Sequence, residues 1–188
     1  MTEPLLAMKG VACVRGGRLL FEALDLTLGP GEATIVAGPN GAGKSSLLRI
    51  AAGLLRPAAG RIDRTERIGF ADEGLALDPK LRLAAALGFW ARLDGGSAGA
   101  AMETMGLAAL ADLPVRMLST GQRKRAVLAR AMASGAPLWL LDEPANGLDA
   151  DGQVRLAAAM AAHRAGGGAV LAASHLPLGL DGARTLSL

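Results

Sequence analysis

Residues 33–55, "ATIVAGPNGAGKSSLLRIAAGLL", predict a strand, a glycine-rich loop and a helix in direct succession. The apolar run "ATIVA" has the length and the flanking glycines of a buried strand. After the loop, Leu47 and Ile50 recur at helical spacing, and Pro57 ends the run. The loop at 38–45 fits the pattern G-x-x-x-x-G-K-[ST]. In this strand–loop–helix setting the pattern predicts a phosphate-binding loop.

The loop supplies the groups that a nucleotide phosphate needs. Its glycines let backbone N–H groups turn toward phosphate oxygens, and the helix N-terminus adds a favourable dipole. We expect Lys44 to reach the β- and γ-phosphates and the Ser45 hydroxyl to coordinate Mg²⁺. The alternative is a glycine-rich turn before a helix, since 26 of the 188 residues are glycine. The residues expected around the phosphates are Gly38, Pro39, Asn40, Gly41, Ala42, Gly43, Lys44, Ser45 and Ser46.

Two acids follow a second apolar strand. Residues 136–144 read "APLWLLDEP", a continuous apolar run that is typical of a central parallel strand. Asp142 at the strand end is suited to hold Mg²⁺, directly or through water. Glu143 is suited to polarise an attacking water as general base. The alternative is an exposed loop that happens to begin with two acids.

The rest of the chain alternates between strands and helices, which indicates an α/β fold with a parallel sheet. Residues 22–28 predict a half-buried strand before the phosphate loop, and short strands are expected at 61–63 and 67–71. The stretch from about 80 to 111 predicts two helices separated by a flexible "DGGSAGA". His163 lies beside Arg164 at a helix end, where we expect it to serve the helix dipole.

Composition limits the class of protein. The net charge is +3 and the only block of like charge is 123–125, so we expect no nucleic-acid partner. The single cysteine, Cys13, excludes an intramolecular disulfide and fits a reducing compartment. No signal peptide is recognisable, and no stretch reaches the roughly 18 apolar residues of a membrane span. We expect a cytoplasmic protein whose membrane role runs through a partner.

The stretch 117–131, "MLSTGQRKRAVLARA", contains no nucleophile with a base and no catalytic acid, yet it is conspicuous. With its "LSTGQ" shortly before the Asp-Glu strand end, the chain resembles ATP-binding-cassette (ABC) ATPases over nearly its whole length. The resemblance implies a P-loop NTPase of the ABC type, with a parallel sheet core, an N-terminal antiparallel β portion and a helical subdomain. It implies one domain, 1–188, with its ATPase core at 1–73 and 117–188 and its helical subdomain at about 74–116.

The resemblance also implies ATP and Mg²⁺ as cofactors and a head-to-tail homodimer. In such dimers the signature of one cassette completes the ATP site of the other. Ser119, Gly121 and Gln122 are the residues that match this signature. An anion at a helix start is physically favoured. Within the triplet that follows, 123–125, a solvated helix face is expected for at least two of the three cations.

Further positions match elements of the family. "NGLD" at 146–149 matches the loop that crosses the dimer interface, with Asp149 as its acid. His175 matches the switch histidine near the γ-phosphate, so the expected catalytic residues are Glu143, His175 and Lys44. The alternative for His175 is a structural histidine after a strand.

Two positions depart from the family's usual pattern. Glu73 stands where the family usually has a metal-contacting glutamine, so the expected metal ligands are Ser45, Asp142 and Glu73. The aromatic that usually stacks on adenine is missing from "CVRGGR", where Arg15 is expected to stack through its guanidinium plane. The expected nucleotide-binding set therefore includes Arg15, the signature residues and Asp149.

Several segments resemble the ATP-binding subunit of the haem-export, or cytochrome c maturation, transporter of Gram-negative bacteria. These segments are "RGGRLLFEALDL", "FWARL", "APLWLLDEP" and "SHLPLGL". The resemblance implies a peripheral subunit on the cytoplasmic face of the inner membrane that works with integral membrane subunits. It places their docking groove around Leu75–Leu93, where Phe89 and Trp90 are candidates. For Trp90, a role in the core of its helix is the favoured alternative.

Three alternatives remain open from the sequence. One is the ATPase of another small exporter, which shares all the chemistry. Another is a soluble cassette protein of DNA repair or translation, although those usually carry two cassettes or large insertions. The third is a binding-only switch without hydrolysis, against which Glu143 and His175 argue.

Overall fold

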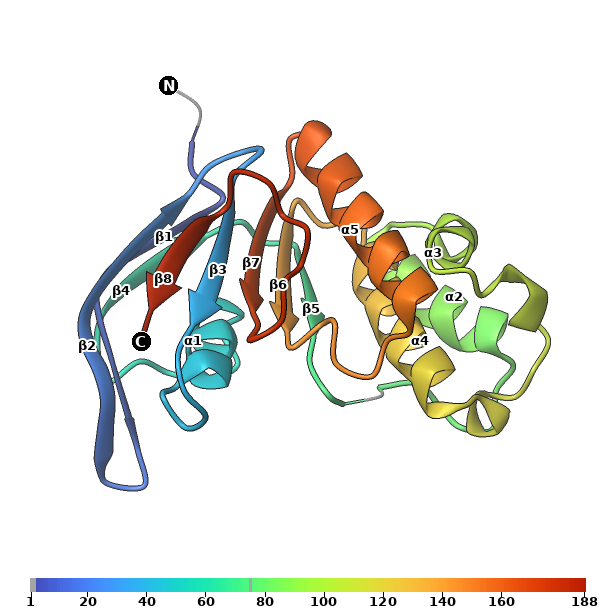
Figure 1. The fold of residues 1–188 in the computed structure, drawn as a ribbon, viewed down its shortest axis with the longest axis horizontal. Coiled ribbons are helices and arrows are strands. Elements are labelled where there is room, and N and C mark those ends of the chain that lie inside the picture. Colours follow the sequence, from blue (N-terminus) through green and yellow to red (C-terminus); the bar gives the residue numbers. More distant parts are fainter. Residues whose placement is uncertain (1–2, 75) are drawn as a thin grey trace.

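The computed structural model describes residues 3–74 and 76–188, which form two sheets and five α-helices (Figure 1). The strands are β1 (Leu6–Arg15), β2 (Arg18–Leu28), β3 (Ala33–Ala37), β4 (Ala59–Arg64), β5 (Ile68–Ala71), β6 (Leu138–Asp142), β7 (Ala169–Ala173) and β8 (Arg184–Ser187). The helices are α1 (Lys44–Ala51), α2 (Leu83–Asp94), α3 (Ala98–Thr104), α4 (Thr120–Ala133) and α5 (Ala150–Ala165). The mixed α/β architecture with a parallel core agrees with the predicted fold class.

The larger sheet has the strand order β5-β6-β7-β3-β8, and every pair in it is parallel. Parallel strands all end at the same edge of a sheet, so the segments that follow β3, β5, β6 and β7 gather there. Those segments are the phosphate loop, the Glu73 segment, the Asp142–Glu143 pair and the His175 segment. The topology thus brings together four stretches that lie far apart in sequence.

The smaller sheet is antiparallel, with the order β2-β1-β4. Strand β1 is the long central strand, and its pairing shifts register after Met8, where Gly10 has a positive φ of 58°. The interruption at Lys9 and Gly10 hides the alternating pattern, so this strand was not assigned from the sequence. The sheet flanks the parallel one at the left of Figure 1.

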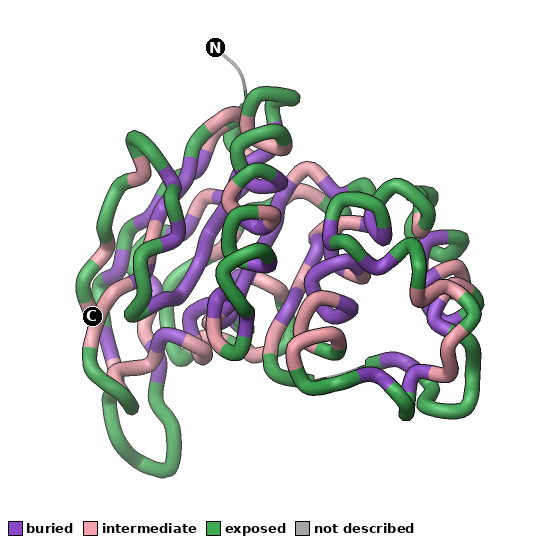
Figure 2. Tube along the Cα trace, turned by 45° about the vertical axis from the view of Figure 1, so that its right-hand side comes forward, coloured by how far each residue is buried: buried purple, intermediate pink, exposed green. Residues whose placement is uncertain are grey.

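Strand β6 joins two apolar cores through the alternation of its side chains. Leu138 and Leu140 pack with α1 between the two sheets, whereas Trp139 and Leu141 pack on the opposite face beneath the other helices. Strand β7 alternates in the same way, and both strands are fully buried. Figure 2 shows the buried central strands and the exposed outer turns of the helices. A strand buried on both faces explains why the run "LWLL" before Asp142 is apolar without a break.

Helices α2, α3 and α4 gather at the end of the molecule away from the antiparallel sheet (Figure 1). Both predicted helices of this part are present, but the second begins earlier than the sequence pattern indicated and ends at Thr104, well before the expected end near residue 111. Ser97 caps α3, and its Oγ accepts a hydrogen bond from the N–H of Ala100 at 3.4 Å. The stretch predicted as a flexible linker is therefore half helix, because a serine N-cap offsets two helix-weakening glycines nearby.

Candidate functional site

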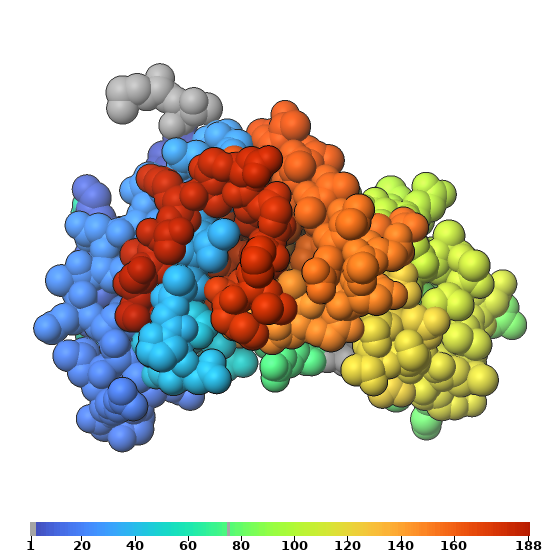
Figure 3. All heavy atoms as spheres, viewed as in Figure 1, coloured from blue at the N-terminus to red at the C-terminus, as the bar shows by residue number. Residues whose placement is uncertain are grey.

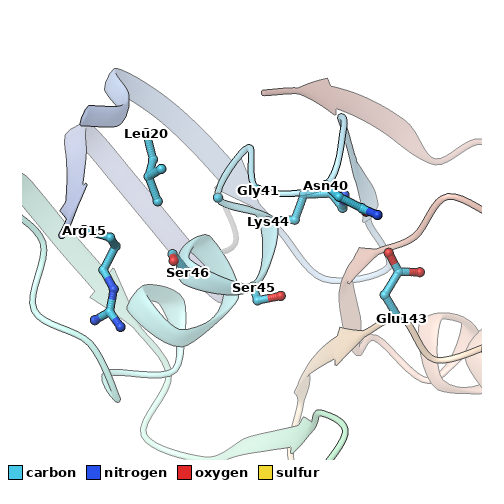
Figure 4. Close-up of a pocket in the computed structure, with 9 residues that line it drawn as sticks. Arg15, Leu20, Asn40, Gly41, Lys44, Ser45, Ser46 and Glu143 are labelled. Carbon is cyan, nitrogen blue, oxygen red and sulfur yellow. The ribbon is translucent and has the colours of Figure 1, made fainter. Parts of the chain in front are cut away.

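A cavity of about 400 Å³ opens at the carboxyl edge of the parallel sheet (Figure 4). The residues that line it are Arg15, Leu20, Asn40, Gly41, Gly43, Lys44, Ser45, Ser46 and Glu143. They come from the β1–β2 turn, the phosphate loop and the end of β6. The structure therefore brings Arg15 and most of the predicted phosphate-loop residues to one place, together with one of the two acids.

Lys44 is held within the loop that it terminates. Its Nζ donates hydrogen bonds to the carbonyl oxygens of Gly38 at 2.8 Å and Pro39 at 3.2 Å, and the residue is only 8% exposed. Gly43 has a φ of +112°, and a Cβ there would meet the ring of Phe21 at 3.1 Å. Strand β2 thus supports the loop from below, and only glycine fits at this turn.

Helix α1 begins at Lys44 with its N-terminus open. Within the described residues no side chain caps this helix, and its first turn contains no acid. The first N–H groups of a helix lack partners inside the helix and favour an anion. The loop and helix start are therefore suited to bind a phosphate group.

Asp142 ends β6 as a buried carboxylate, 6% exposed. Burial raises the pKa of Asp142, while the Ser45 hydroxyl and Arg49 lower it. Its Oδ1 atom is buried without a hydrogen-bond partner among the described residues. An orphaned carboxylate oxygen beside a serine hydroxyl is an oxygen pair of the kind that Mg²⁺ prefers. The residues present therefore fit the metal that the sequence predicts.

Glu143 and His175 contact each other across neighbouring strand ends. The Nδ1 atom of His175 lies 2.9 Å from Oε2 of Glu143, whose side chain is 16% exposed. Glu143 has a φ of +45°, a conformation that is uncommon for a residue other than glycine. Its N–H donates to the carbonyl of Ala173 at 2.9 Å, which fixes the strained position. The carboxylate is thus both oriented and partly shielded from solvent.

The signature segment begins α4 with a capping box. Gln122 N–H donates to Ser119 Oγ at 3.3 Å, and Ser119 N–H donates to Gln122 Oε1 at 2.8 Å. Asp149 caps α5, because its Oδ1 accepts a hydrogen bond from Gly152 N–H at 2.9 Å. A Cβ added to Gly121 would lie 3.4 Å from the carbonyl oxygen of Gly147. The signature and the 146–149 loop are therefore in contact within one chain.

None of the signature residues lines the cavity around the phosphate loop. Figure 3 shows the phosphate-loop segment in cyan and the start of α4 in yellow at separate places on the same face. Within a single chain the structure does not bring Ser119, Gly121, Gln122 or Asp149 to the phosphate loop.

The expectation that at least two of the three cations at 123–125 lie on a solvated helix face is wrong, because only one of them is exposed. Arg123 is exposed, and it donates to the carbonyl of Arg116 at 2.8 Å. Arg125 has a side chain only 16% exposed that points toward Asp151. Burial lowers the pKa of Lys124, and the negative charges of Glu73, Asp142, Glu143 and Asp72 act to raise it. Helix α4 packs along β5, and of the three cations only Lys124 is influenced by the acids at the strand ends.

Glu73 follows β5 as an exposed residue and does not line the cavity. Its neighbour Asp72 was not among the predicted site residues, although it pairs with Arg49 at 3.6 Å and affects the pKa of Asp142. Leu20 was also missed. The fold explains both positions. Asp72 directly follows β5, the neighbour of the strand that ends at Asp142, and Leu20 lies near the start of β2 beneath the loop.

The expected dipole role of His163 is not supported. Its ring stacks on Trp139 with centroids 3.8 Å apart and planes 5° from parallel. Burial lowers the pKa of His163, although the carbonyls of Pro137 and Ala169 oppose this shift. The packing favours the neutral ring, which carries no charge to stabilise a helix C-terminus.

Residues 21–146 of this chain match the sequence pattern of the ABC transporter family. The chain belongs to the ABC transporter family. Two curated relatives carry the name cytochrome c biogenesis ATP-binding export protein CcmA. The relative from Sphingopyxis alaskensis is 62% identical over 94% of this chain and 92% of its own length. The relative from Novosphingobium aromaticivorans is 56% identical over 100% of this chain and 97% of its own.

Solved structures share the fold of the cassette. An ATP-binding subunit of an ABC transporter superposes with a TM-score of 0.83 at 23% identity, covering 92% of this chain and 80% of that one. A dimeric ATP-binding cassette with ADP and Pi superposes with a TM-score of 0.78 at 22% identity, covering 91% and 88%. The cassette is thus an ABC ATPase, which binds and hydrolyses ATP. Across residues 3–74 and 76–188, no helix has the length and apolar character to cross a bilayer.

Proposed function

We propose that the cassette is the ATP-hydrolysing subunit of the ABC transporter of cytochrome c biogenesis, in which it powers the export step that involves haem. The observation that carries this proposal is the 62% identity to a CcmA protein over 94% of the chain. The alignment covers nearly the whole chain, so the identity extends beyond the site motifs. The ATPase of another small exporter would share those motifs, and the identity over the rest of the chain is what favours the cytochrome c system.

ATP binds in the cavity with its phosphates over the start of α1. Lys44 leaves the carbonyls of Gly38 and Pro39 and pairs with the phosphate oxygens. Its ammonium group thereby exchanges two uncharged acceptors for negatively charged ones. Arg15 and Leu20 line the outer part of the cavity and take the adenine. Ser45 and Asp142 would hold Mg²⁺, which would neutralise phosphate charge when bound. Glu73 lies outside the cavity lining, and its negative charge acts on the site through solvent or through Lys124.

Hydrolysis depends on Glu143, the acid in the strained turn that follows β6. Glu143 accepts a proton from the attacking water as general base. His175 holds the carboxylate through its Nδ1 contact of 2.9 Å and leaves its other ring nitrogen free to face the γ-phosphate. Glu143 and His175 follow the neighbouring strands β6 and β7, so the sheet rather than a long loop sets the distance between them.

The signature acts in trans, in a head-to-tail dimer. Ser119, Gly121 and Gln122 lie outside the cavity of their own chain, which supports their use by a second copy. The exposed start of α4 offers N–H groups and a hydroxyl to the γ-phosphate held by the partner. The 146–149 loop touches the signature through Gly147 and Gly121, so both enter the interface together.

The membrane subunits dock on the helical part, at the cytoplasmic face of the inner membrane. Phe89 on α2 is 48% exposed and offers an apolar contact. Trp90 has another role, because its Nε1 donates to the carbonyl of Ala76 at 2.8 Å and Arg130 lies over its ring. Leu75, the first residue of the expected docking groove, lies outside the described residues.

A haem-stained gel tests the proposal in the source bacterium. Lys44→Ala is introduced at the native locus, with Lys9→Ala, at an exposed lysine of β1 that does not line the cavity, as the matched control. The proposal expects c-type cytochrome bands to vanish in Lys44→Ala at normal total haem, and to persist in Lys9→Ala. Unchanged bands in a Lys44→Ala strain that expresses the protein would overturn the cytochrome c assignment and leave the ATPase fold intact.

A further inference from the structure

Helices α3, α4 and α5 lie near one another (Figure 1), and a cluster of two arginines and one aspartate joins them. Arg125 lies on α4, and Asp151 and Arg155 lie on α5. Nε of Arg155 is 2.7 Å from Oδ2 of Asp151, and NH1 of Arg125 is 3.9 Å from the same oxygen. One carboxylate oxygen thus faces both guanidinium groups and joins the two helices.

The same guanidinium groups reach the carboxyl end of α3. NH1 of Arg125 donates to the carbonyl of Met105 at 3.4 Å, and NH1 of Arg155 donates to the carbonyl of Thr104 at 3.5 Å. The last carbonyls of a helix lack partners inside the helix and favour cations. The cluster therefore ties α3 to both other helices.

Gly106 gives independent evidence that the two side chains lie against the backbone. A Cβ at this position would be 2.9 Å from Nε of Arg155 and 3.3 Å from NH1 of Arg125. Its φ is +65°. Arg125 is also the least exposed of these charged side chains, at 16%, so its contacts are shielded from solvent.

The position of the cluster connects it to the signature and to the 146–149 loop. Arg125 follows the signature on the first turns of α4, and Asp151 follows the 146–149 loop on the first turn of α5. The two loops touch through Gly121 and Gly147. A change in the angle between α4 and α5 would therefore displace both loops relative to each other.

We propose that Arg125, Asp151 and Arg155 form a clamp that fixes the signature and the 146–149 loop as one rigid surface for the second copy. The three are positioning residues, since none lines the ATP cavity. The clamp rests on the proposed trans arrangement. Its role there is to keep the signature and the 146–149 loop in a fixed position relative to each other. Losing it lowers the affinity between the copies and leaves the binding of ATP to one copy unchanged.

The test uses the chain with Glu143→Gln, whose dimerisation with Mg-ATP is followed by sedimentation velocity. Gly106→Ala displaces both guanidinium groups without altering their chemistry. Gly95→Ala is the matched control, because Gly95 ends α2 with a φ of +75° and a Cβ there meets nothing within 4 Å. Asp151→Asn removes the shared charge, and Asp112→Asn, in the exposed pair with Arg82, controls for loss of a surface charge.

The clamp predicts a roughly tenfold weaker dimer for Gly106→Ala and Asp151→Asn, and parent values for Gly95→Ala and Asp112→Asn. Binding of a fluorescent ATP analogue to the monomer should match the parent in all four. Equal dimer affinity in clamp and control variants would overturn the clamp. A Glu143→Gln parent that stays monomeric with Mg-ATP would instead reject the trans arrangement, and the clamp with it. If Gly106→Ala unfolds, Asp151→Asn decides alone.

Discussion

The imidazole of His175 lies 2.9 Å from the carboxylate of Glu143, between the ends of two neighbouring parallel strands. The distance joins a histidine with an exposed ring to an acid that is 16% exposed. Glu143 also carries the positive φ of 45° that turns its side chain toward this position. A sheet edge, a strained turn and a hydrogen bond thus orient one carboxylate at the wall of the ATP cavity.

Replacing Glu143 by glutamine should reduce ATP hydrolysis by roughly 10²- to 10⁴-fold, the usual contribution of a general base. The shape of the side chain and the contact with His175 remain, so ATP binding should stay near wild type. Phosphate release from the purified cassette measures the rate, and Glu22→Gln, on exposed β2, is the control. Hydrolysis within twofold of wild type would show that another group acts as the base.

His175→Ala should slow hydrolysis and leave the folded state nearly as stable as wild type, because the ring is 57% exposed. Without the ring, Glu143 loses its 2.9 Å contact and samples other rotamers. Phosphate release and the melting temperature are measured together. A large fall in melting temperature with an unchanged rate would assign the contact to stability alone.

Lys44→Ala should weaken ATP binding roughly a hundredfold, corresponding to about 3 kcal/mol for hydrogen bonds from a charged group. The variant also leaves the carbonyls of Gly38 and Pro39 without their donor, so the loop itself loosens. A fluorescent ATP analogue measures the affinity. Lys80→Ala provides the comparison, and a Lys44→Ala protein that binds the analogue like this control would contradict the assignment of the cavity.

The stacked pair of His163 and Trp139 predicts loss of stability in acid. Burial lowers the pKa of His163, so the unfolded chain binds a proton more readily than the folded one. The contribution is fully present above the ordinary histidine pKa of about 6.5 and is lost as the pH falls through the folded pKa. Urea unfolding of wild type and His163→Phe at pH 7.5 and pH 5 measures it.

His163→Phe keeps a ring against Trp139 and removes the titration. Its free energy of unfolding should therefore fall less than that of wild type between the two pH values. Equal falls would show that other groups dominate the acid response. Fluorescence from Trp139 follows the same transition, because its ring lies 3.8 Å from that of His163.

Phe89 and Trp90 lie next to each other in sequence and offer a paired test of docking. Phe89→Ala should leave the ATPase rate of the isolated cassette unchanged and reduce cytochrome c maturation, since Phe89 is 48% exposed. Trp90→Ala should instead destabilise the cassette by about 2 kcal/mol, from one hydrogen bond and one cation–π contact. Thermal unfolding and haem staining separate the two, and normal maturation in Phe89→Ala would move the docking surface elsewhere.

Much of the fold could be predicted because local patterns and tertiary contacts agree. The strand "ATIVA" has the expected bounds, β6 extends one residue beyond the expected strand to include Asp142, and the phosphate loop lies between its predicted strand and helix. Strand β1 could not be assigned, since its pattern is broken at Lys9 and Gly10 where the pairing shifts register. The early start of α3 depends on a single cap by Ser97, a signal that two nearby glycines obscure.

Several residues of the short contiguous motifs line one cavity, as the sequence leads one to expect, whereas contacts that depend on packing could not be predicted. The contacts of Arg125 with α3 and α5 require knowing that three helices meet at Gly106. The stack of His163 on Trp139 joins a helix end to a strand 24 positions earlier in the chain, which no local pattern encodes. Asp72 could have been found, because an acid after a parallel strand lies beside the acids of the neighbouring strand.

The most direct test of the account is the mass of the Glu143→Gln protein with Mg-ATP in sedimentation velocity. A cassette whose signature completes the site of a second copy should sediment at twice the 19.0 kDa of one chain with ATP, and as a monomer with ADP. A single 19.0 kDa species at saturating Mg-ATP would contradict the account, because the signature would then have no nucleotide to contact.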